Sequence, residues 1–216
     1  TVPLGVVPGG TGNTWAFDLG LPTEPVGAAE AICSGATRAV DVMEVTSSSR
    51  GPPKFSINIC AAGFPAAVLD ATDELRWLGF GAQYDLAGLL LISQGKTKFR
   101  ATLDVVRPSG ETERMDLNDC SFVQAHINAR MGKLVPFAPN AEVDDGLLDL
   151  VLVKSSSGLD IILANFLARF GEHENVMDAV EIIQCKAFAV APKPRPLAAL
   201  GSPEDVVADA KGGDQT

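Results

Sequence analysis

The sequence predicts an α+β fold in which a short α/β segment precedes a mostly antiparallel β domain with a few helices. The chain opens with an apolar, β-prone stretch, a glycine turn and a helical stretch, which together form half of a βαβ unit. From residue 98 onward, apolar residues recur with a period of two between turn sequences, as in antiparallel strands. Elsewhere, and most clearly at 158–171, they recur every three to four positions, as in amphipathic helices.

The elements near the amino terminus follow from local sequence. VPLGVV at 2–7 is apolar and β-prone and predicts a strand, and the PGGTG that follows predicts a turn. Asn13 is placed to cap a helix that Gly20 ends, because asparagine accepts backbone N–H bonds and glycine adopts the left-handed conformation. Residues 24–34 predict a second helix, and residues 38–46 predict a strand.

The middle of the chain predicts one more strand and two helices. KFSINICAAGF at 54–64 is rich in β-prone residues and follows the SSSRGPP loop. Residues 65–95 repeat apolar positions at helical spacing, and a break near Gly79 and Gly81 divides them into two helices.

The second half of the chain predicts an antiparallel sheet or sandwich. Its expected strands are KFRATLDVVR at 98–107, ETERMDL at 111–117, SFVQAHINAR at 121–130 and GLLDLVLVK at 146–154. An amphipathic helix is expected at 158–171, and 175–192 predicts one long strand or a bent pair. Residues 192–216 are rich in Pro, Ala and Asp without a period, so we expect a disordered tail there.

Composition narrows the function classes. With 46% hydrophobic and 20% charged residues, 216 residues can bury a sizeable core. A formal net charge of -10 and a pI near 4.6 argue against a nucleic-acid partner, which needs a basic surface to neutralise phosphates. No apolar run reaches the roughly 18 residues needed to cross a bilayer. We therefore expect a soluble protein or one that contacts a membrane peripherally.

The four cysteines have no metal-binding or disulfide spacing, and Cys60 and Cys185 lie in β-rich runs. This pattern predicts reduced core thiols and a cytoplasmic location. The sequence begins at Thr1 without a methionine or a signal peptide, and we expect it to begin within a longer protein.

The first candidate site is VPGGTGN at 7–13. Glycines between a strand and a helix let the backbone approach a phosphate, and the first N–H groups of the helix supply positive potential. The loop lacks the lysine of a P-loop and the third glycine of a dinucleotide fingerprint. A tight strand-to-helix turn with no ligand remains the alternative.

The second candidate site is VDDG at 143–146. Asp144 and Asp145 could hold a divalent cation through carboxylate and backbone oxygens, which hard cations prefer. On pattern alone, an Asp-Gly turn joining two strands is the better interpretation.

Five segments in order resemble the diacylglycerol kinase catalytic family, which includes sphingosine and ceramide kinases, and the resemblance covers about residues 1–192. They are PLGVVPGGTGNTWAFDLGLP, RAVDVMEV with FSINICAAGF, LGFGAQYDLAGL, HINARMGKLVPFAPNAEVDDGLLDLVLV, and FGEHENVMDAVEIIQCKAFAVAP. Five ordered matches are more specific than any single motif. The related NAD kinase group shares the plan but would not be expected to combine GTGN with DDGLLDLVLV.

The resemblance implies a nucleotide domain, a β-sandwich domain and an active site between them. Residues 1–22 would then be the end of the nucleotide domain, 23–191 the sandwich domain, and 192–216 the tail. The resemblance assigns ATP binding to Gly9, Gly10, Thr11, Gly12 and Asn13. It also implies Mg²⁺, with Asp41 in the metal-linked network and Asp144 and Asp145 at a structural metal site.

The chain departs from the family pattern at several positions. Thr14 stands where the family usually has Asp after the loop Asn, and Pro65 follows Gly63 and Phe64 where relatives often have Asp. The upstream Gly-Gly-Asp-Gly-Thr loop and the Asp-Gly-Glu strand that supplies the general base are absent from these 216 residues. The sequence therefore assigns no catalytic residue.

Two functions remain open at this point. The first is an ATP-dependent lipid kinase, represented by an incomplete chain, that acts on diacylglycerol, a sphingoid base or a similar lipid. The second is a non-catalytic, pseudokinase-like module that binds lipid or protein. Thr14 and the missing base favour the second, whereas the preserved loop and the Asp-Asp-Gly block favour descent from the first. The aromatic segment at 75–84 is a candidate for peripheral membrane contact, although core packing is the expected role of Trp77.

Overall fold

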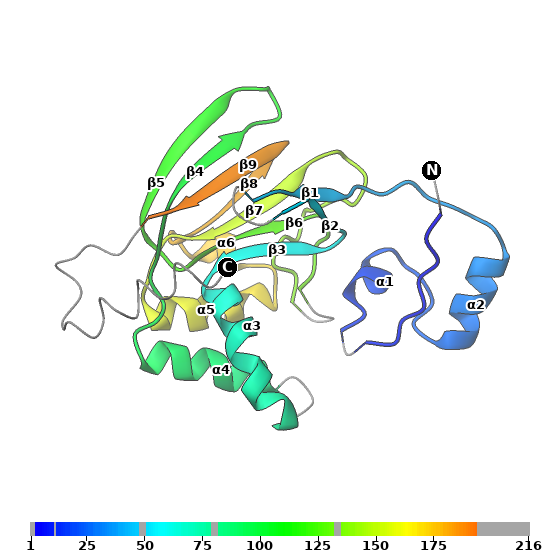
Figure 1. Cartoon of the computed structure of the whole chain (residues 1–216), viewed down its shortest axis with the longest axis horizontal. Coiled ribbons are helices and arrows are strands. Elements are labelled where there is room, and N and C mark those ends of the chain that lie inside the picture. The colour runs from blue at the N-terminus through cyan, green and yellow to red at the C-terminus, as the bar shows by residue number, and fades with distance from the viewer. Residues whose placement is uncertain (1–2, 11, 48–50, 79–81, 132–134, 194–216) are drawn as a thin grey trace.

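The computed structural model describes residues 3–10, 12–47, 51–78, 82–131 and 135–193. It consists of three antiparallel sheets with helices packed at one side and at one end (Figure 1). The predicted α+β class is confirmed. Within the described residues, no helix is both long and apolar enough to span a bilayer.

The amino-terminal region forms two short helices and a small hairpin. These are α1 (Thr14–Asp18), α2 (Pro25–Cys33), β1 (Met43–Val45) and β2 (Lys54–Ser56). The strand expected at 2–7 is wrong, since its described residues pair with no strand. The strand expected at 38–46 shortens to β1, which pairs with β2 in a two-stranded sheet. Both helices lie where the sequence predicts them.

The central sheet has the order β3-β6-β7-β8. Its strands are β3 (Ile59–Gly63), β6 (Phe122–His126), β7 (Leu148–Val153) and β8 (Val180–Cys185). The strand expected at 54–64 is divided, because Ser56 Oγ bonds the Ile59 carbonyl across a turn and β3 joins a different sheet from β2. Every residue of β6 is buried, so this sheet is covered on both faces.

The second large sheet has the order β5-β4-β9. It contains β4 (Phe99–Val106), β5 (Thr112–Cys120) and β9 (Ala187–Pro192). The bent pair offered for 175–192 is confirmed, because the chain leaves β8, passes Lys186 and enters β9 in the other sheet. Lys186 N donates to the Val106 carbonyl at 2.8 Å and fixes this crossing.

Two core clusters define the layers. The first lies between the two large sheets and includes Leu103, Val123 and Leu150, all at most 2% exposed. The second lies between the opposite face of the central sheet and the helices, and it includes Phe122 and Ile161. The order of layers is therefore a three-stranded sheet, the central sheet and a helical layer.

The helical layer follows the predicted periodicity. It contains α3 (Phe64–Thr72), the 3-10 helix η1 (Asp73–Leu78), α4 (Ala82–Ser93), α5 (Gly158–Ala168) and α6 (His173–Val176). Sequence analysis missed α6, a single turn that overlaps the start of the segment predicted as a strand at 175–192. At the start of α3, Gly63 has φ 88, and an added Cβ would meet the Ser121 carbonyl oxygen, so this turn requires glycine.

Candidate functional site

The glycine loop ends in a left-handed residue. Asn13 has φ 46 and ψ 31, and its carbonyl accepts the first bond of α1 from Phe17 N at 3.0 Å. Its side chain does not cap the helix as expected. Instead Oδ1 turns back and accepts from Gly10 N at 2.8 Å, which the left-handed backbone allows.

The loop leaves space for a ligand at its first glycine. A Cβ at Gly9 would have no heavy atom within 4 Å, whereas one at Gly10 would lie 3.3 Å from Asn13 Oδ1. Gly12 and Asn13 are half-buried, and Thr11 lies outside the described residues. The role of these five residues in nucleotide binding stays a prediction.

A buried carboxylate joins α1 to the sandwich domain. The side chain of Asp18 is 4% exposed and its Oδ1 pairs with Arg130 Nη1. Its Oδ2 accepts from Asn128 Nδ2 at 2.7 Å and from Arg130 N at 3.0 Å. Phe17 adds a cation–π contact, with its ring centroid 4.9 Å from Arg130 Cζ. Four contacts thus hold the helix after the glycine loop against segment 128–130.

A cavity of ≈ 260 Å³ lies at this junction. Its lining residues are Asp18, Arg38, Ala129, Arg130, Ala141, Glu142, Val143 and Asp144. Two buried polar atoms, Trp15 Nε1 and Asn128 Oδ1, have no hydrogen-bond partner within the described part of the chain. Such groups are normally satisfied by a ligand or an ordered water.

The acidic residues proposed for metal binding lie around one turn. Asp41 Oδ2 accepts from Gly146 N at 2.7 Å, and Asp145 Oδ1 accepts from Leu147 N at 2.9 Å. Arg38 donates to Asp144 Oδ2 through Nε at 3.0 Å and Nη2 at 2.7 Å.

A divalent cation does not fit this arrangement as it stands. Among the described residues, no three His, Cys, Asp or Glu side chains come together closely enough to hold a metal. The VDDG segment is a turn, as the alternative interpretation has it, but it precedes β7 and does not join two adjacent strands. A cation at Asp144 would first have to displace the Arg38 guanidinium.

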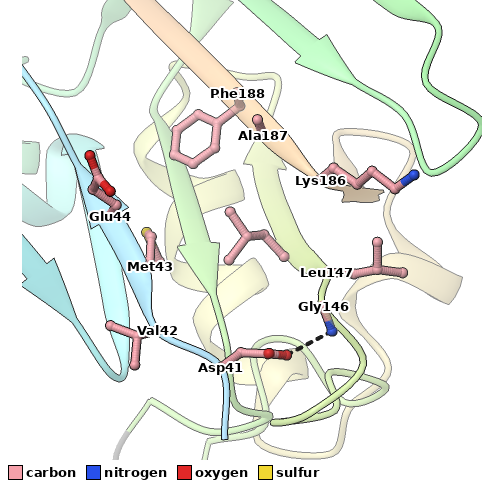
Figure 2. Close-up of a pocket in the computed structure, with 10 residues that line it drawn as sticks. Asp41, Val42, Met43, Glu44, Gly146, Leu147, Lys186, Ala187 and Phe188 are labelled. Carbon is pink, nitrogen blue, oxygen red and sulfur yellow. Dashed lines mark hydrogen bonds between the residues drawn. The ribbon is translucent and has the colours of Figure 1, made fainter. Parts of the chain in front are cut away.

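A second cavity, of ≈ 320 Å³, lies on the other side of this turn. Figure 2 shows Asp41 bonded to Gly146 at one end and Lys186 with Phe188 at the other. The remaining lining residues are Val42, Met43, Glu44, Leu147, Leu148 and Ala187. Asp41 therefore connects the segment before β1 to the turn before β7 and lines this cavity.

Two buried histidines flank Phe137 beneath the central sheet. The ring centroids of His126 and Phe137 are 6.4 Å apart, and His173 Nε2 lies 2.9 Å from the Phe137 carbonyl oxygen. Burial lowers the pKa of His126 to about 4 and also lowers the pKa of His173. Both imidazoles are therefore neutral at physiological pH.

Asp149 is the unusual acid of the central sheet. It is 4% exposed on β7, opposite His126 of β6. Burial, with a smaller contribution from the carboxylates of Asp145 and Glu174, raises the pKa of Asp149 to about 6. A buried acid with a raised pKa is a candidate site residue, and sequence analysis missed it.

Sequence analysis also missed the anchoring pair. Asp18 is one acid on a short helix, and Arg130 lies 112 positions away in sequence, so neither residue alone predicts a site. Asp18, Asn128 and Arg130 all lie within segments that resemble the family, but the resemblance does not say that they contact one another.

Comparison with known proteins identifies two domains. Residues 1–45 match the family model of the diacylglycerol kinase catalytic domain, and residues 58–208 match the YegS C-terminal NAD kinase beta sandwich-like domain. The domain boundaries expected at residues 22 and 191 stay a prediction.

Curated relatives and a solved structure agree with these matches. A diacylglycerol kinase of Mycobacterium tuberculosis is 32% identical over 158 residues, covering 72% of this chain and 48% of the relative. Sphingosine kinase 1 of Arabidopsis thaliana is 26% identical over 233 residues, covering 90% and 47%. The crystal structure of a Bacillus anthracis diacylglycerol kinase superposes with a TM-score of 0.56 at 21% identity, covering 87% of this chain and 56% of that one.

The solved structure shows the shared fold, and the sequence matches carry the family assignment. The chain spans about half the length of these relatives. Because the sandwich-domain match alone covers more than half of the 216 residues, the chain belongs to the diacylglycerol kinase and YegS-type lipid kinase family.

Proposed function

We propose that this chain forms part of an ATP-dependent lipid kinase. In the reaction, a lipid hydroxyl oxygen bonds to the γ-phosphorus of ATP, the bond to the β–γ bridging oxygen breaks, and the hydroxyl proton passes to a base. The acceptor would be diacylglycerol, a sphingoid base or a related lipid. The supporting observation is the buried Asp18, which fixes the glycine loop and α1 against segment 128–130 of the sandwich domain.

The glycine loop would receive the phosphates of ATP. Backbone N–H groups can approach an anion where no Cβ intervenes, and the space around Gly9 is open. Arg38 and Arg130 line the adjacent cavity, where Asp144 and Asp18 pair with their guanidinium groups, and these groups are the cations of that lining that could contact a phosphate. We assign no residue of this chain as the general base.

Magnesium enters this proposal in two ways. It accompanies ATP as the substrate complex, in which it neutralises phosphate charge. It would also compete with Arg38 for Asp144, with Asp145 and Asp41 nearby, because carboxylates are the oxygen ligands that Mg²⁺ prefers. No catalytic step depends on this second cation.

The lipid substrate implies contact with a membrane surface, in a protein otherwise expected in the cytoplasm. Within segment 75–84, the side chain of Trp77 is 78% exposed and that of Tyr84 is 46% exposed. The expectation that Trp77 packs in the core is therefore wrong, because η1 turns it outward. Exposed aromatic rings favour the lipid–water boundary. Phe80 lies outside the described residues.

The test is transfer of radiolabel from ATP to lipid by the natural protein that contains this sequence, in detergent micelles with diacylglycerol or sphingosine. Gly9→Asp places a negative charge in the proposed phosphate site, and Gly9→Asn places nearly the same volume there without charge. Both fit the open space at this position. We expect Gly9→Asp to lose activity about 100-fold or more and Gly9→Asn to lose clearly less.

One competing function has a specific observation in its favour. Thr14 is buried and neutral at a position where the family pattern has an acid, so a non-catalytic module that binds lipid or protein is the second candidate. Absence of label transfer with every lipid, together with lipid binding by the folded protein, would favour the module. Equal activity of Gly9→Asp and Gly9→Asn would remove the phosphate role of the loop.

A further inference from the structure

Helix α5 carries apolar residues on both faces. Its inner face, formed by Ile161, Ala164 and Ala168, packs into the second core cluster. Its outer face consists of Leu159 (78% exposed), Ile162 (45%), Leu163 (44%), Phe166 (56%) and Phe170 (66%). We call these five residues the α5 outer face.

The α5 outer face is continuous. Its residues are spaced three, four, seven and eleven positions from Leu159, so they form one stripe along the helix and its final turn. Phe166 and Phe170 meet edge to face with ring centroids 5.6 Å apart. The outward side of a surface helix is normally polar, and a contiguous apolar patch indicates an interaction surface.

The acidic side chain next to the α5 outer face points away from it, and a basic side chain lies at its end. Asp160 is turned aside, with Oδ2 accepting from Ser155 Oγ at 2.5 Å. Arg169, at the end of the helix, is exposed and forms no ion pair with any residue that the structure describes. An exposed apolar stripe can insert at the boundary between the headgroups and acyl chains of a bilayer, and a cation at its end can contact the headgroups.

The dimensions of the stripe argue against a second copy as its partner. An 11-residue helix is about 16 Å long and about 10 Å wide, whereas a stable dimer buries about 800 Å² per partner. A bilayer needs no complementary surface and can accept a narrow stripe of leucine and phenylalanine.

We propose that the α5 outer face inserts into the interface of a lipid bilayer and holds the protein at the membrane. This proposal rests on the proposed lipid kinase function, because such an enzyme must reach a hydroxyl at headgroup depth. In Figure 1, α5 lies with α3 and α4 on the side of the central sheet that faces away from β4 and β5. With a net charge of -10, attraction to the bilayer depends on apolar burial, so binding is insensitive to salt.

The experiment measures sedimentation of the natural protein with phosphatidylcholine vesicles, with and without diacylglycerol. Phe166→Ser with Phe170→Ser should weaken binding roughly 100-fold, since inserting each ring contributes about a factor of ten. Leu159→Ser, at the most exposed position of the stripe, should weaken it by a smaller factor and is the safer variant for folding. Phe55→Ser is the matched control, because Phe55 is 71% exposed on β2 and lies outside the helical layer.

Three results would overturn the proposal. Vesicle binding by the folded double variant equal to that of the parent excludes the α5 outer face. Equal loss with Phe55→Ser shows non-specific adhesion. A dimer of the parent in sedimentation velocity that the double variant dissociates makes the partner a second copy.

Label transfer separates failure of this proposal from failure of the proposed function. If the α5 outer face holds the enzyme at the membrane, the double variant keeps full activity on lipid in detergent micelles and loses it on vesicles. If the parent protein transfers no label to lipid in micelles or in vesicles but still binds vesicles through α5, the proposed kinase function is contradicted. The membrane contact of α5 is then still supported.

Discussion

The segment that precedes β1 and the sandwich domain are held by different interactions. Of the described residues before Met43, only Pro8, Thr14, Ala16 and Ala28 are buried. Leu4, Val7, Phe17, Val26, Ile32 and Val42 remain exposed. The sandwich instead buries two large apolar clusters. The position of the glycine loop therefore depends on polar contacts, whereas the stability of the protein depends on the sandwich.

The polar contacts that hold the amino-terminal segment occur at three points. Asp18 bonds Asn128 and Arg130, Arg38 pairs with Asp144, and Asp41 bonds the turn before β7. Polar contacts are sensitive to charge and geometry, so small substitutions should move this segment while the sandwich stays folded. Separate measurements on the two regions can test this difference.

The largest expected effect compares one substitution in the two regions. Leu150 is fully buried in the core between the sheets, and Leu4 is 75% exposed. Leu150→Ala should lower the free energy of unfolding by about 2–5 kcal/mol, because it removes buried methyl groups and leaves a cavity. Leu4→Ala should change it by less than about 0.5 kcal/mol. Urea unfolding followed by circular dichroism measures both, and similar losses would contradict the division.

The next effect concerns the pH dependence of the sandwich. Burial raises the folded-state pKa of Asp149 to about 6, so its stabilising contribution is fully present below about pH 3.8 and is lost as pH rises through 6. Asp149→Asn removes this loss. The stability of the variant relative to the parent should therefore rise by about 2 kcal/mol between pH 4 and pH 8.

A control of opposite sign is available on the surface. A hydrogen bond from Lys193 lowers the pKa of Asp116, so its contribution is present at neutral pH and is lost in acid. For Asp116→Asn, stability relative to the parent should fall slightly as pH rises. His126 is present in all three proteins, so its own loss of stability below pH 6.5 cancels in the comparison. Parallel curves for Asp149→Asn and the parent would refute the raised pKa.

The two regions also differ in how well sequence predicts them. β6 and β7 were found because runs such as LDLVLV are β-prone and mark strands buried on both faces. The strand at 2–7 failed because an apolar segment becomes a strand only when a neighbour supplies its hydrogen bonds.

The candidate site shows the same limit. The glycine loop is local and could be predicted, whereas the Asp18–Arg130 contact joins residues 112 positions apart. Neither the charges of the two residues nor their distance in sequence indicates that they meet in the folded protein. The burial of Asp149 was equally hidden, because it depends on which face of β7 the helical layer covers. Trp77 was misjudged because aromatic composition predicts burial, and the short η1 turns that side chain outward.

A smaller effect should follow from breaking the Asp18 anchor. Asp18→Asn keeps the shape of the side chain and removes the charge that Arg130 contacts, at a cost of about 1–3 kcal/mol to docking of the segment. Hydrogen exchange should then speed up in α1 and α2 and stay unchanged in β6 and β7.

A double-mutant cycle with Arg130→Ala separates the pair from its surroundings. If the two residues act together, the double variant should be little worse than either single variant. Additive losses would show that Asp18 acts mainly through Asn128 and the backbone N–H of Arg130. Faster exchange across the whole sandwich would show that the two regions unfold together.

The smallest expected effect is at the exposed Arg38–Asp144 pair, whose side chains are 56% and 40% exposed. Arg38→Ala alone should cost less than about 1 kcal/mol, because exposed ion pairs contribute little. The same variant frees Asp144 for a cation, so millimolar Mg²⁺ should raise its melting temperature more than that of the parent. Asp144→Asn with Asp145→Asn should abolish the increment in either background. An equal Mg²⁺ response in all four proteins would mean that these carboxylates close the turn before β7 and bind no cation.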